Sequence, residues 1–317
     1  MKIQRLSVDG FRGLPDRTFL FTDPRSGRAA PLVVVTGPTG SGKTSFLEAI
    51  IAGKERVAAY GPVPSESACV RPGAGAAKVK IAWELSEGDR QRTGADLTTL
   101  EGEAIFGGAL TPPMNDPALT ALLGDYDADP ASSKVEYFHA TRRMAIGQSV
   151  DATQLASGPV ERARRLTRDD AKYAGLVRFI VAAGLGLDVD PLGNPRPPGR
   201  GTAAFAKLCT SKRLSGLYRA GDGVFPGFQD DAGRALGLTQ LSDGELDALL
   251  FATAFVRNGI RGSVVLVDTP ELHRSDAEAR ALVDGLLSIE EDNQLVVATR
   301  APSVIGMVPR ELVVQLG

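Results

Sequence analysis

The octet Gly37-Pro38-Thr39-Gly40-Ser41-Gly42-Lys43-Thr44 decides the fold of this chain of 317 residues. It matches the pattern G-x-x-x-x-G-K-[ST] of a phosphate-binding loop. The apolar run Leu32-Val33-Val34-Val35 precedes it, and residues 45–51 after it have the apolar spacing of a helix. The pattern requires a strand before the glycine-rich loop and a helix after it. The octet therefore predicts a loop that holds the phosphates of a nucleotide.

Each part of the octet has a chemical role in this prediction. Its glycines allow consecutive backbone N–H groups to converge on the phosphates, with the positive end of the following helix behind them. Lys43 is expected to reach the β- and γ-phosphates, and the hydroxyl of Thr44 to bind Mg²⁺. The alternative is a glycine-rich turn that binds no ligand. The predicted nucleotide-binding residues here are Gly37, Pro38, Thr39, Gly40, Ser41, Gly42, Lys43, Thr44 and Ser45.

A second motif, Leu241-Ser242-Asp243-Gly244-Glu245, lies near the other end of the chain. Taken alone, it also fits an ordinary helix start with a serine cap, because apolar residues at helical spacing follow it. Residues 263–268 come next and consist of a serine, four apolar residues and an aspartate. Such a run is typical of a buried parallel strand that ends in a carboxylate, so Asp268 is expected to hold Mg²⁺.

These motifs, in this order, resemble those of ABC-type ATPase heads of the RecF- and SMC-like group, which is AAA-type and related to the OLD ATPases. The pentapeptide resembles their LSGGQ-type signature, and residues 263–268 resemble their Walker B strand. Gly10-Phe11-Arg12-Gly13 resembles their "FRG" turn, residues 268–273 their "DEPElh" and residues 294–302 their "QlivaTHSP". The resemblance also implies a β-hairpin at residues 228–238, before the signature.

The resemblance implies an α/β fold: a P-loop NTPase of ABC-ATPase type with a mixed central sheet flanked by helices, an antiparallel β lobe and a helical lobe. We expect one head over residues 1–317. Its parts are an N-terminal lobe with the Walker A loop and antiparallel strands (1–140), a basic helical lobe (141–224), and a region with signature, Walker B strand and switch (225–317). Residues 61–224 show no sustained heptad, so no coiled-coil insertion is expected.

The middle of the chain is covered by the resemblance only in position, and its elements are predicted from local patterns. Residues 78–85 alternate between polar and apolar, and residues 134–139 are also expected to form a strand. A helix is expected from residue 161 toward residue 181. The proline-rich stretch 184–200 breaks it, and a second helix is expected over 203–218.

The resemblance further implies a mechanism with ATP and Mg²⁺ as cofactors. In this family two heads dimerise head to tail, so that each ATP lies between the Walker A loop of one subunit and the signature of the other. Ser242 and the backbone N–H of Gly244 are then expected to face the γ-phosphate, with Glu245 completing the signature. Arg12 resembles the family arginine near the phosphates. The alternative for Arg12 is a surface arginine after the first strand.

Two positions depart from the family pattern. The residue after Asp268 is normally a glutamate that activates the attacking water; here it is Thr269, and Glu271 is the nearest replacement. Because losing a general base typically costs about 10²–10⁴ in rate, hydrolysis is expected to be slow or conditional. The family histidine of the switch is replaced by Arg300, which either contacts the γ-phosphate or is simply exposed. The predicted catalytic residues are Lys43, Asp268, Glu271 and Arg300, and the predicted Mg²⁺ ligands are Thr44 and Asp268.

The charge of the chain is unevenly distributed. The net charge is −2, yet residues 142–219 contain fourteen Lys or Arg and six Asp or Glu. Such a stretch favours DNA or an acidic protein as a partner, and solvated helix faces are the alternative. Gln148 and Gln154 are both candidates for the family glutamine that senses Mg²⁺, and no local pattern selects one.

Composition predicts a cytoplasmic protein without a membrane segment. The two cysteines, Cys69 and Cys209, exclude a disulfide framework, and no signal peptide or long apolar run is evident. The favoured function is an ATPase that couples dimer closure to DNA or a protein partner, in genome maintenance or defence by analogy. A nucleotide-locked switch with negligible turnover is the alternative. An ATPase subunit of a transporter is disfavoured, because the "FRG" start and the LS-x-GE form of the signature indicate the other branch.

Overall fold

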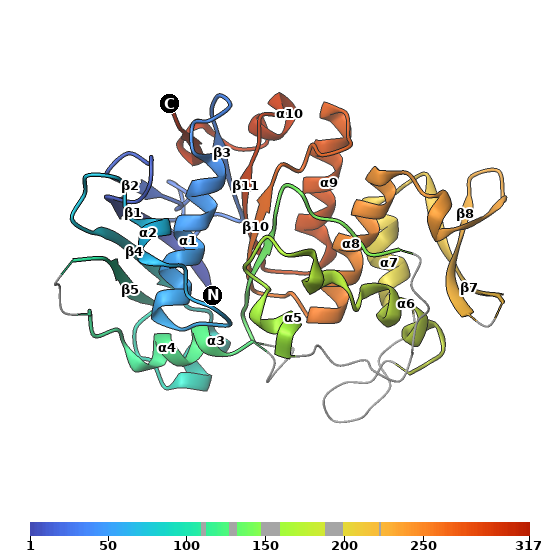
Figure 1. The fold of residues 1–317 in the computed structure, drawn as a ribbon, viewed down its shortest axis with the longest axis horizontal. Helices are drawn as coiled ribbons and strands as arrows, with labels where there is room; N and C mark the ends of the chain where they lie inside the picture. Colours follow the sequence, from blue (N-terminus) through green and yellow to red (C-terminus); the bar gives the residue numbers. More distant parts are fainter. Residues whose placement is uncertain (109–111, 127–131, 147–158, 188–198, 222) are drawn as a thin grey trace.

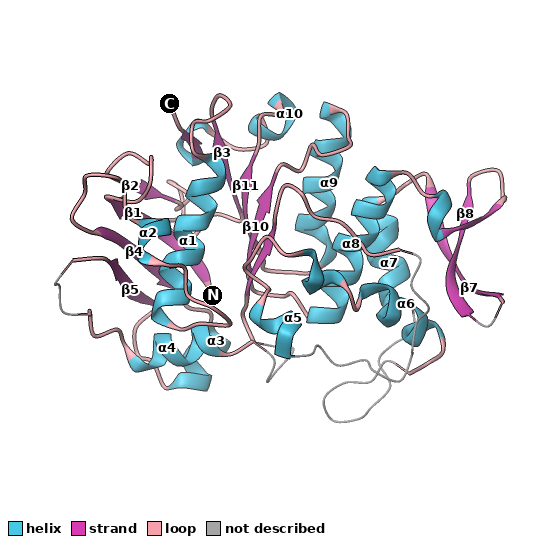
Figure 2. Cartoon of the chain, viewed as in Figure 1, coloured by secondary structure: helices cyan, strands magenta, loops and turns pink. Residues whose placement is uncertain are grey.

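The computed structural model of the chain describes residues 1–108, 112–126, 132–146, 159–187, 199–221 and 223–317. These described residues form three sheets and a set of helices, arranged along the longest axis of the molecule (Figures 1 and 2). An antiparallel sheet lies at one end and a parallel sheet in the middle. A group of helices follows, and a hairpin stands at the other end.

The middle sheet has five strands in the order β12-β3-β11-β10-β6, and every pair in it is parallel. Its strands are β3 (Leu32–Thr36), β6 (Val135–Phe138), β10 (Val264–Asp268), β11 (Gln294–Ala298) and β12 (Val313–Gln315). All residues of the first four of these strands are buried, as in a sheet covered on both faces. The register pairs Asp268 with Ala298 and Ala298 with Val35. The carboxyl ends of three strands therefore meet at one edge, where open parallel sheets bind ligands.

The antiparallel sheet at the N-terminal end has four strands in the order β2-β1-β4-β5. The strands are β1 (Lys2–Asp9), β2 (Arg17–Leu20), β4 (Ala77–Glu84) and β5 (Thr99–Phe106). Three short helices belong to the same part of the chain: α2 (Glu66–Cys69), α3 (Glu87–Thr93) and α4 (Pro117–Gly124). The strand predicted at residues 78–85 is confirmed as β4, and the one predicted at 134–139 as β6.

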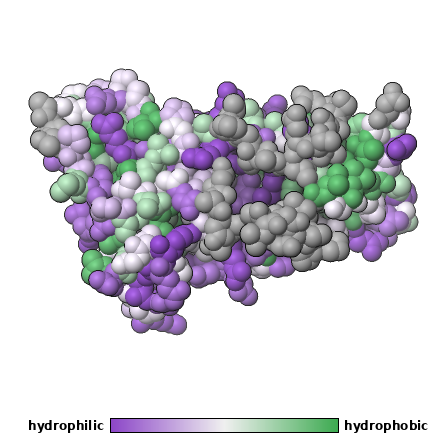
Figure 3. All heavy atoms as spheres, turned by 90° about the horizontal axis from the view of Figure 1, so that it is seen from below, coloured by the Kyte–Doolittle hydropathy of each residue, from purple (hydrophilic) through white to green (hydrophobic). Residues whose placement is uncertain are grey.

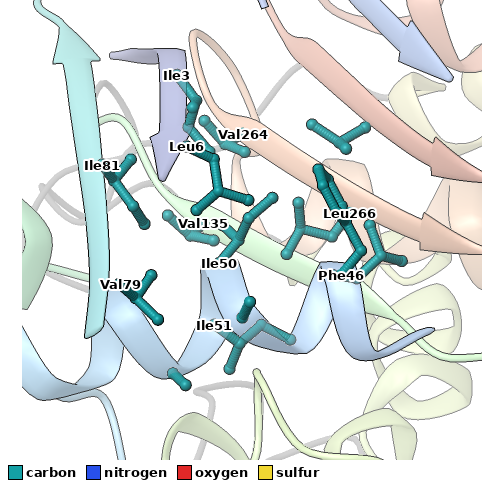
Figure 4. Close-up of a cluster of buried hydrophobic side chains, with 14 of the residues drawn as sticks. Ile3, Leu6, Phe46, Ile50, Ile51, Val79, Ile81, Val135, Val264 and Leu266 are labelled. Atoms are coloured by element: carbon teal, nitrogen blue, oxygen red, sulfur yellow. The ribbon is translucent and has the colours of Figure 1, made fainter. Parts of the chain in front are cut away.

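Helix α1 (Lys43–Val57) lies between the antiparallel sheet and the middle sheet. Its apolar side chains meet those of both sheets in one core (Figure 4). Burial of each large apolar side chain contributes about 1.5–3 kcal/mol, so this core fixes the start of α1 relative to the strand ends. The labelled side chains of this core are Ile3, Leu6, Phe46, Ile50, Ile51, Val79, Ile81, Val135, Val264 and Leu266.

The other face of the middle sheet is covered by helices. They are α6 (Leu176–Gly184), α7 (Arg200–Leu208), α8 (Asp243–Asn258) and α9 (Asp276–Ile289). Val34, Val265 and Val297 point into a second core with these helices. The remaining short helices are α5 (Pro159–Ala163), α10 (Pro302–Ile305), η1 (Asp170–Tyr173), η2 (Leu238–Gln240) and η3 (Arg310–Leu312).

The third sheet contains β7 (Lys212–Ala220), β8 (Gly223–Asp230) and β9 (Ala235–Gly237), and its long hairpin stands at the far end of the molecule (Figure 1). The helix predicted over 203–218 is therefore wrong beyond Leu208, where α7 ends. The following residues pair with β8 instead, and Gly216 in their middle has a φ of +137° that no helix allows. The hairpin predicted before the signature is confirmed as β8 and β9.

The helix predicted from residue 161 toward residue 181 is also interrupted, because α5 ends at Ala163 and α6 begins at Leu176. The ammonium of Lys172 is buried in the gap and donates to the carbonyl oxygens of Arg165 (3.1 Å), Thr167 (2.8 Å) and Tyr137 (2.6 Å). These contacts give the carbonyls of Arg165 and Thr167 in the loop a partner that a helix would otherwise provide, and they tie the loop to Tyr137 of β6. A tertiary contact has replaced the local helical preference.

The predicted fold class is confirmed: an α/β structure with parallel and antiparallel pairing, divided among separate sheets. The longest helix among the described residues is α8, with 16 residues. Among all the residues that the structure describes, no helix is both long enough and apolar enough to cross a membrane. The division of the head at residues 140 and 224 stays a prediction.

Candidate nucleotide-binding site

The predicted Walker A loop connects β3 to α1 at the ligand-binding edge of the middle sheet. Gly37 has a φ of +149°, and a Cβ at this position would lie 2.1 Å from the carbonyl oxygen of Leu316. Gly42 has a φ of +95° and is the N-cap of α1. These two positions accept only glycine without distortion, so the glycines of the octet are explained by the shape of the loop.

The side chain of Lys43 lies against the loop. Its ammonium donates to the carbonyl oxygens of Gly37 (2.8 Å) and Pro38 (2.9 Å). Burial lowers the pKa of Lys43, and the neighbouring charge of Arg300 lowers it further. The carboxylates of Asp268 and Glu271 act in the opposite direction and raise the pKa of Lys43, so the other three predicted catalytic residues all act on this lysine.

The predicted Mg²⁺ ligands lie side by side. The hydroxyl of Thr44 donates to Oδ2 of Asp268 at 2.7 Å, and the hydroxyl of Thr269 donates to Oδ1 of the same carboxylate at 3.1 Å. Asp268 is only 3% exposed, and burial raises its pKa. A hydroxyl and a carboxylate are oxygen ligands of the kind that Mg²⁺ prefers, and a divalent cation would offset the cost of burying the carboxylate. The residues present therefore fit the metal.

Hydrogen bonds of Glu271 and Arg300 connect the carboxyl ends of the strands with the Walker A loop. The carboxylate of Glu271 accepts from the hydroxyl of Thr299 at 2.7 Å and from the backbone N–H of Arg300 at 2.9 Å. Nη1 of Arg300 donates to the hydroxyl of Thr39 at 2.9 Å. The guanidinium thus lies against the Walker A loop. The roles of both residues toward a phosphate or a water stay predictions.

Thr269, which occupies the place of the family glutamate, has an unusual backbone. Its φ is +55°, in the left-handed region that β-branched residues rarely adopt. Its N–H donates to the carbonyl oxygen of Ala298 at 2.8 Å, which fixes the turn against β11. Such a conformation costs about 1–3 kcal/mol and persists only where the surroundings hold it.

Arg12 lies beside α1 rather than on the loop. Its guanidinium donates to the carbonyl oxygen of Ala68 at 2.7 Å, forms an ion pair with Glu48 and lies over the ring of Phe11. Glu48 also pairs with Arg168 at 2.6 Å. The charge of Arg168 lowers the pKa of Asp268, although burial outweighs it, so this arginine belongs to the electrostatic surroundings of the site. The sequence held no signal that could single out Arg168.

The signature begins α8. Ser242 is the N-cap, its hydroxyl accepts from the N–H of Glu245 at 3.3 Å, and the carboxylate of Glu245 accepts from the N–H of Ser242 at 2.8 Å. These two hydrogen bonds form a capping box. The pentapeptide therefore does start a helix with a serine cap, as its sequence alone also predicted. Glu245 additionally accepts from the hydroxyl of Ser211 at 2.8 Å and pairs with Lys212 at 3.1 Å.

A small pocket of about 240 Å³ opens beside the signature, and Ser242 and Gly244 line it together with His273 and Arg274. A Cβ on Gly244 would lie 3.0 Å from the carbonyl oxygen of His273, so this position is also tight. The hydrogen bonds and ion pairs described here join the signature residues to one another and to Ser211 and Lys212. None of these contacts joins them to the Walker A loop. Gln148 and Gln154 lie outside the described residues.

Comparisons with known proteins bear on the fold that holds this candidate site. A family model for an AAA domain matches residues 5–69, which include the second half of β1, the Walker A loop and α1. Curated protein sequences gave no match. The fold is similar to a solved Smc head bound to the C-winged helix domain of ScpA, with a TM-score of 0.56 at 15% identity, over 96% of this chain and 92% of that one.

It is also similar to an Smc head domain with an extended coiled coil, bound to the C-terminal domain of ScpA and derived from Pyrococcus furiosus. Here the TM-score is 0.53 at 13% identity, over 96% of this chain and 91% of that one. At such identities the likeness concerns the fold, and it covers nearly the whole of each chain. The fold of this chain is therefore similar to that of SMC heads, and its residues 5–69 match an AAA domain.

Proposed function

We propose that this chain binds ATP with Mg²⁺ and closes a head-to-tail homodimer around it. The observation that carries the proposal is the contact of the Thr44 hydroxyl with the Asp268 carboxylate at 2.7 Å, at the start of the helix that follows the Walker A loop. Lys43 and Arg300 bring two positive charges to the same place. This combination of hydroxyl, carboxylate and cations suits a magnesium nucleotide and few other ligands.

In this proposal the backbone N–H groups of the loop and the ammonium of Lys43 bind the phosphates, which replace the carbonyl oxygens that Lys43 now contacts. Thr44 and Asp268 hold the metal. Mg²⁺, when bound, neutralises charge on the phosphate oxygens. Arg300 adds a permanent positive charge beside the loop.

The dimer is proposed because the signature lies in a separate group of contacts. Ser242 and Gly244 line a pocket with His273 and Arg274. Donors at the start of a helix suit a γ-phosphate, so each signature is proposed to complete the site of the partner subunit. Closure would then depend on a nucleotide with a γ-phosphate.

Hydrolysis is proposed to be slow or conditional. Thr269 lacks a carboxylate, and the carboxylate of Glu271 already accepts hydrogen bonds from Thr299 and Arg300. The same observation favours the second candidate, a nucleotide-locked switch or scaffold with negligible turnover. In either function, ATP binding and closure come before any bond is broken.

DNA or a protein partner is proposed to bind only part of the basic stretch 142–219. Several cations of residues 142–219 pair with acids outside it: Arg142 with Asp247, Arg168 with Glu48, Arg200 with Glu290 and Lys212 with Glu245. Arg213 and Arg219 lie on β7 and form no ion pair among the described residues. The view from below shows an apolar patch toward this end of the molecule (Figure 3). Leu185, Leu187 and Tyr218 are among the exposed large apolar side chains of the described residues.

A surface with both cations and apolar side chains suits an acidic protein as well as DNA. Both solved heads described above are complexes with a ScpA domain, which favours a protein partner. Titration of the parent and of Arg213→Glu/Arg219→Glu with duplex DNA at two salt concentrations tests the DNA arm. Salt-sensitive binding that the variant weakens supports it, and no binding by the parent removes it.

We further propose a cytoplasmic location and no membrane partner. The transporter subunit remains the weakest of the three functions, because the "FRG" start and the LS-x-GE signature favour the other branch. Co-purification with a membrane protein would revive it.

ATP binding itself is tested by titrating the parent and Lys43→Ala with ATP, with and without Mg²⁺. We expect binding by the parent that requires Mg²⁺, and a loss of at least about 10²-fold in Lys43→Ala, because a charged hydrogen bond to a phosphate is removed. The control is Lys2→Ala, a lysine on β1 that pairs with Asp292 and takes no part in the site. Equal binding by the parent and Lys43→Ala would defeat the proposal.

A further inference from the structure

A buried cluster of three charges connects the nucleotide site with the signature helix α8, to which its central member Asp247 belongs. Arg142 donates to both oxygens of Asp247, at 2.6 and 2.9 Å, and Arg274 pairs with the same carboxylate. The side chains of Arg142, Asp247 and Arg274 are 0%, 5% and 6% exposed. Burial alone would raise the pKa of Asp247, but the two arginines outweigh it and lower this pKa.

The outer ends of this cluster contact both halves of the site. Nη1 of Arg142 donates to the carbonyl oxygen of Asp268 at 2.8 Å, at the end of β10. Nη2 of Arg274 donates to the carbonyl oxygen of Gly244 at 2.6 Å, in the first turn of α8. Arg142 also lies 4.7 Å over the ring of Phe251 on α8. One continuous set of hydrogen bonds therefore joins the Walker B aspartate to the signature glycine.

Stability alone is a weak reason for this arrangement, because buried ion pairs often stabilise a protein no more than apolar residues of similar size. The position of the cluster, in contact with both the Walker B aspartate and the signature glycine, explains the arrangement better. A guanidinium holds a flat, two-pronged geometry and stays charged, so it transmits a shift of one partner to the other. Asp247 sits between two such groups and keeps both in place.

We propose that Arg142, Asp247 and Arg274 are positioning residues that couple the nucleotide site of a head to the signature of the same head. The inference rests on the proposed function, in which that signature serves the other nucleotide of the dimer. Occupancy of Asp268 by a magnesium nucleotide shifts the carbonyl that Arg142 holds, and the cluster passes this shift to Gly244. Each site thereby biases the other, with a coupling in the usual range of about 5–150-fold.

The test uses Mg²⁺ and ADP, which occupy Thr44 and Asp268 without offering a γ-phosphate to a partner. Hydrogen exchange of the backbone amides of residues 243–247 is measured with and without this ligand, and the affinity for ADP is measured in parallel. In the parent, the ligand is expected to change the exchange rates by about five-fold or more. In Arg274→Gln this change is lost, while the affinity for ADP stays within about three-fold of the parent, because Arg274 lies on the signature side and ADP offers no γ-phosphate to a signature.

The matched control is Arg280→Gln, an exposed arginine of α9 whose ion pair with Asp284 spans 3.7 Å; it should behave as the parent. Arg142→Lys gives a second test if Arg274→Gln fails to fold, since it keeps the charge and loses the two-pronged contact. A parental response in a folded cluster variant would overturn the inference. Binding of ADP by the parent without any response at residues 243–247 would also overturn it, and would leave the proposed function standing. Absence of nucleotide binding would defeat both.

Discussion

At the scale of single residues, Asp268 carries the clearest conflict between stability and ligand binding. Its carboxylate is buried among two hydroxyl donors, and burial raises its pKa. A folded chain without ligand therefore bears the cost of burying this charge, whereas a bound divalent cation offsets it. Residues at ligand sites commonly lower the stability of the free protein in this way.

The first prediction follows from that conflict. Asp268→Asn should raise the free energy of unfolding of the ligand-free chain by about 0.5–2 kcal/mol, because the buried charge is removed while an oxygen acceptor remains. The same variant should lose the thermal stabilisation that Mg²⁺ and ATP give the parent. Thermal unfolding with and without the ligands measures both effects. A variant that is less stable than the parent and still responds to Mg²⁺ would contradict the assignment.

The second prediction concerns the missing base. Thr269→Glu restores the carboxylate at the family position, so ATP turnover should rise, by up to about 10²–10⁴ if the parent lacks a base altogether. Turnover is measured in the parent, Thr269→Glu and Glu271→Gln. A rate absent from the parent and gained in Thr269→Glu supports the nucleotide-locked switch. A substantial parental rate that Glu271→Gln abolishes defeats the switch and makes Glu271 the base.

At the scale of elements, α8 and α9 begin in the same way. Ser242 and Glu245 form one capping box, and Ser275 and Glu278 form the other. Loss of either serine should cost about 1 kcal/mol of stability, because an N–H at the helix start loses its acceptor. Only Ser242 belongs to the signature.

This pair gives the third prediction. Ser242→Ala and Ser275→Ala should lower the free energy of unfolding by similar amounts, but only Ser242→Ala should weaken ATP-dependent dimerisation. Denaturant unfolding and sedimentation measure the two properties separately. If both variants impair dimerisation equally, the effect is one of helix stability and the signature has no special role.

The segment between α5 and α6 gives a prediction about pH. Burial lowers the pKa of Lys172 to about 7, and likewise that of Lys54 to about 7. In the unfolded chain a lysine titrates near 10.4, so between about pH 7 and pH 10 the unfolded state binds more protons. The free energy of unfolding should therefore rise with pH in this window, by at most about 1.4 kcal/mol per pH unit for each lysine.

Unfolding by denaturant at pH 7, 8 and 9 measures this slope. Lys172→Met should reduce the slope by the contribution of one lysine, although it also lowers stability, because three carbonyl oxygens lose their donor. Lys54→Met should reduce it by a similar amount. A flat pH dependence in the parent would show that neither ammonium is buried in this way.

The elements also show how far the sequence could predict this structure. The strand, loop and helix around residues 32–51 and the strand ending at Asp268 follow from local patterns, and they are present as β3, α1 and β10. The helix expected over 203–218 was wrong beyond Leu208, because pairing with β8 decided its second half. Arg142 could not have been linked to Asp247, which lies 105 positions away, since only the fold brings them together.

At the scale of the whole molecule, the chain holds two groups of candidate residues, and the buried cluster of Arg142, Asp247 and Arg274 joins them. The Walker A loop, Asp268, Glu271 and Arg300 form one group, and the signature forms the other. A single head therefore offers half of each of two sites under the proposed function. Two heads that bind ATP between them would complete both sites, and the buried cluster of Arg142, Asp247 and Arg274 would let each site affect the other.

The most direct test of the ATP-dependent dimer is the sedimentation mass of the purified chain with Mg²⁺ and ATP, with ADP, and without nucleotide. We expect a mass that doubles with ATP and stays that of one chain with ADP or without nucleotide, because only ATP offers a γ-phosphate to the partner's signature. Lys43→Ala should remain a monomer under all three conditions. A mass that never changes with ATP would contradict the head-to-tail dimer.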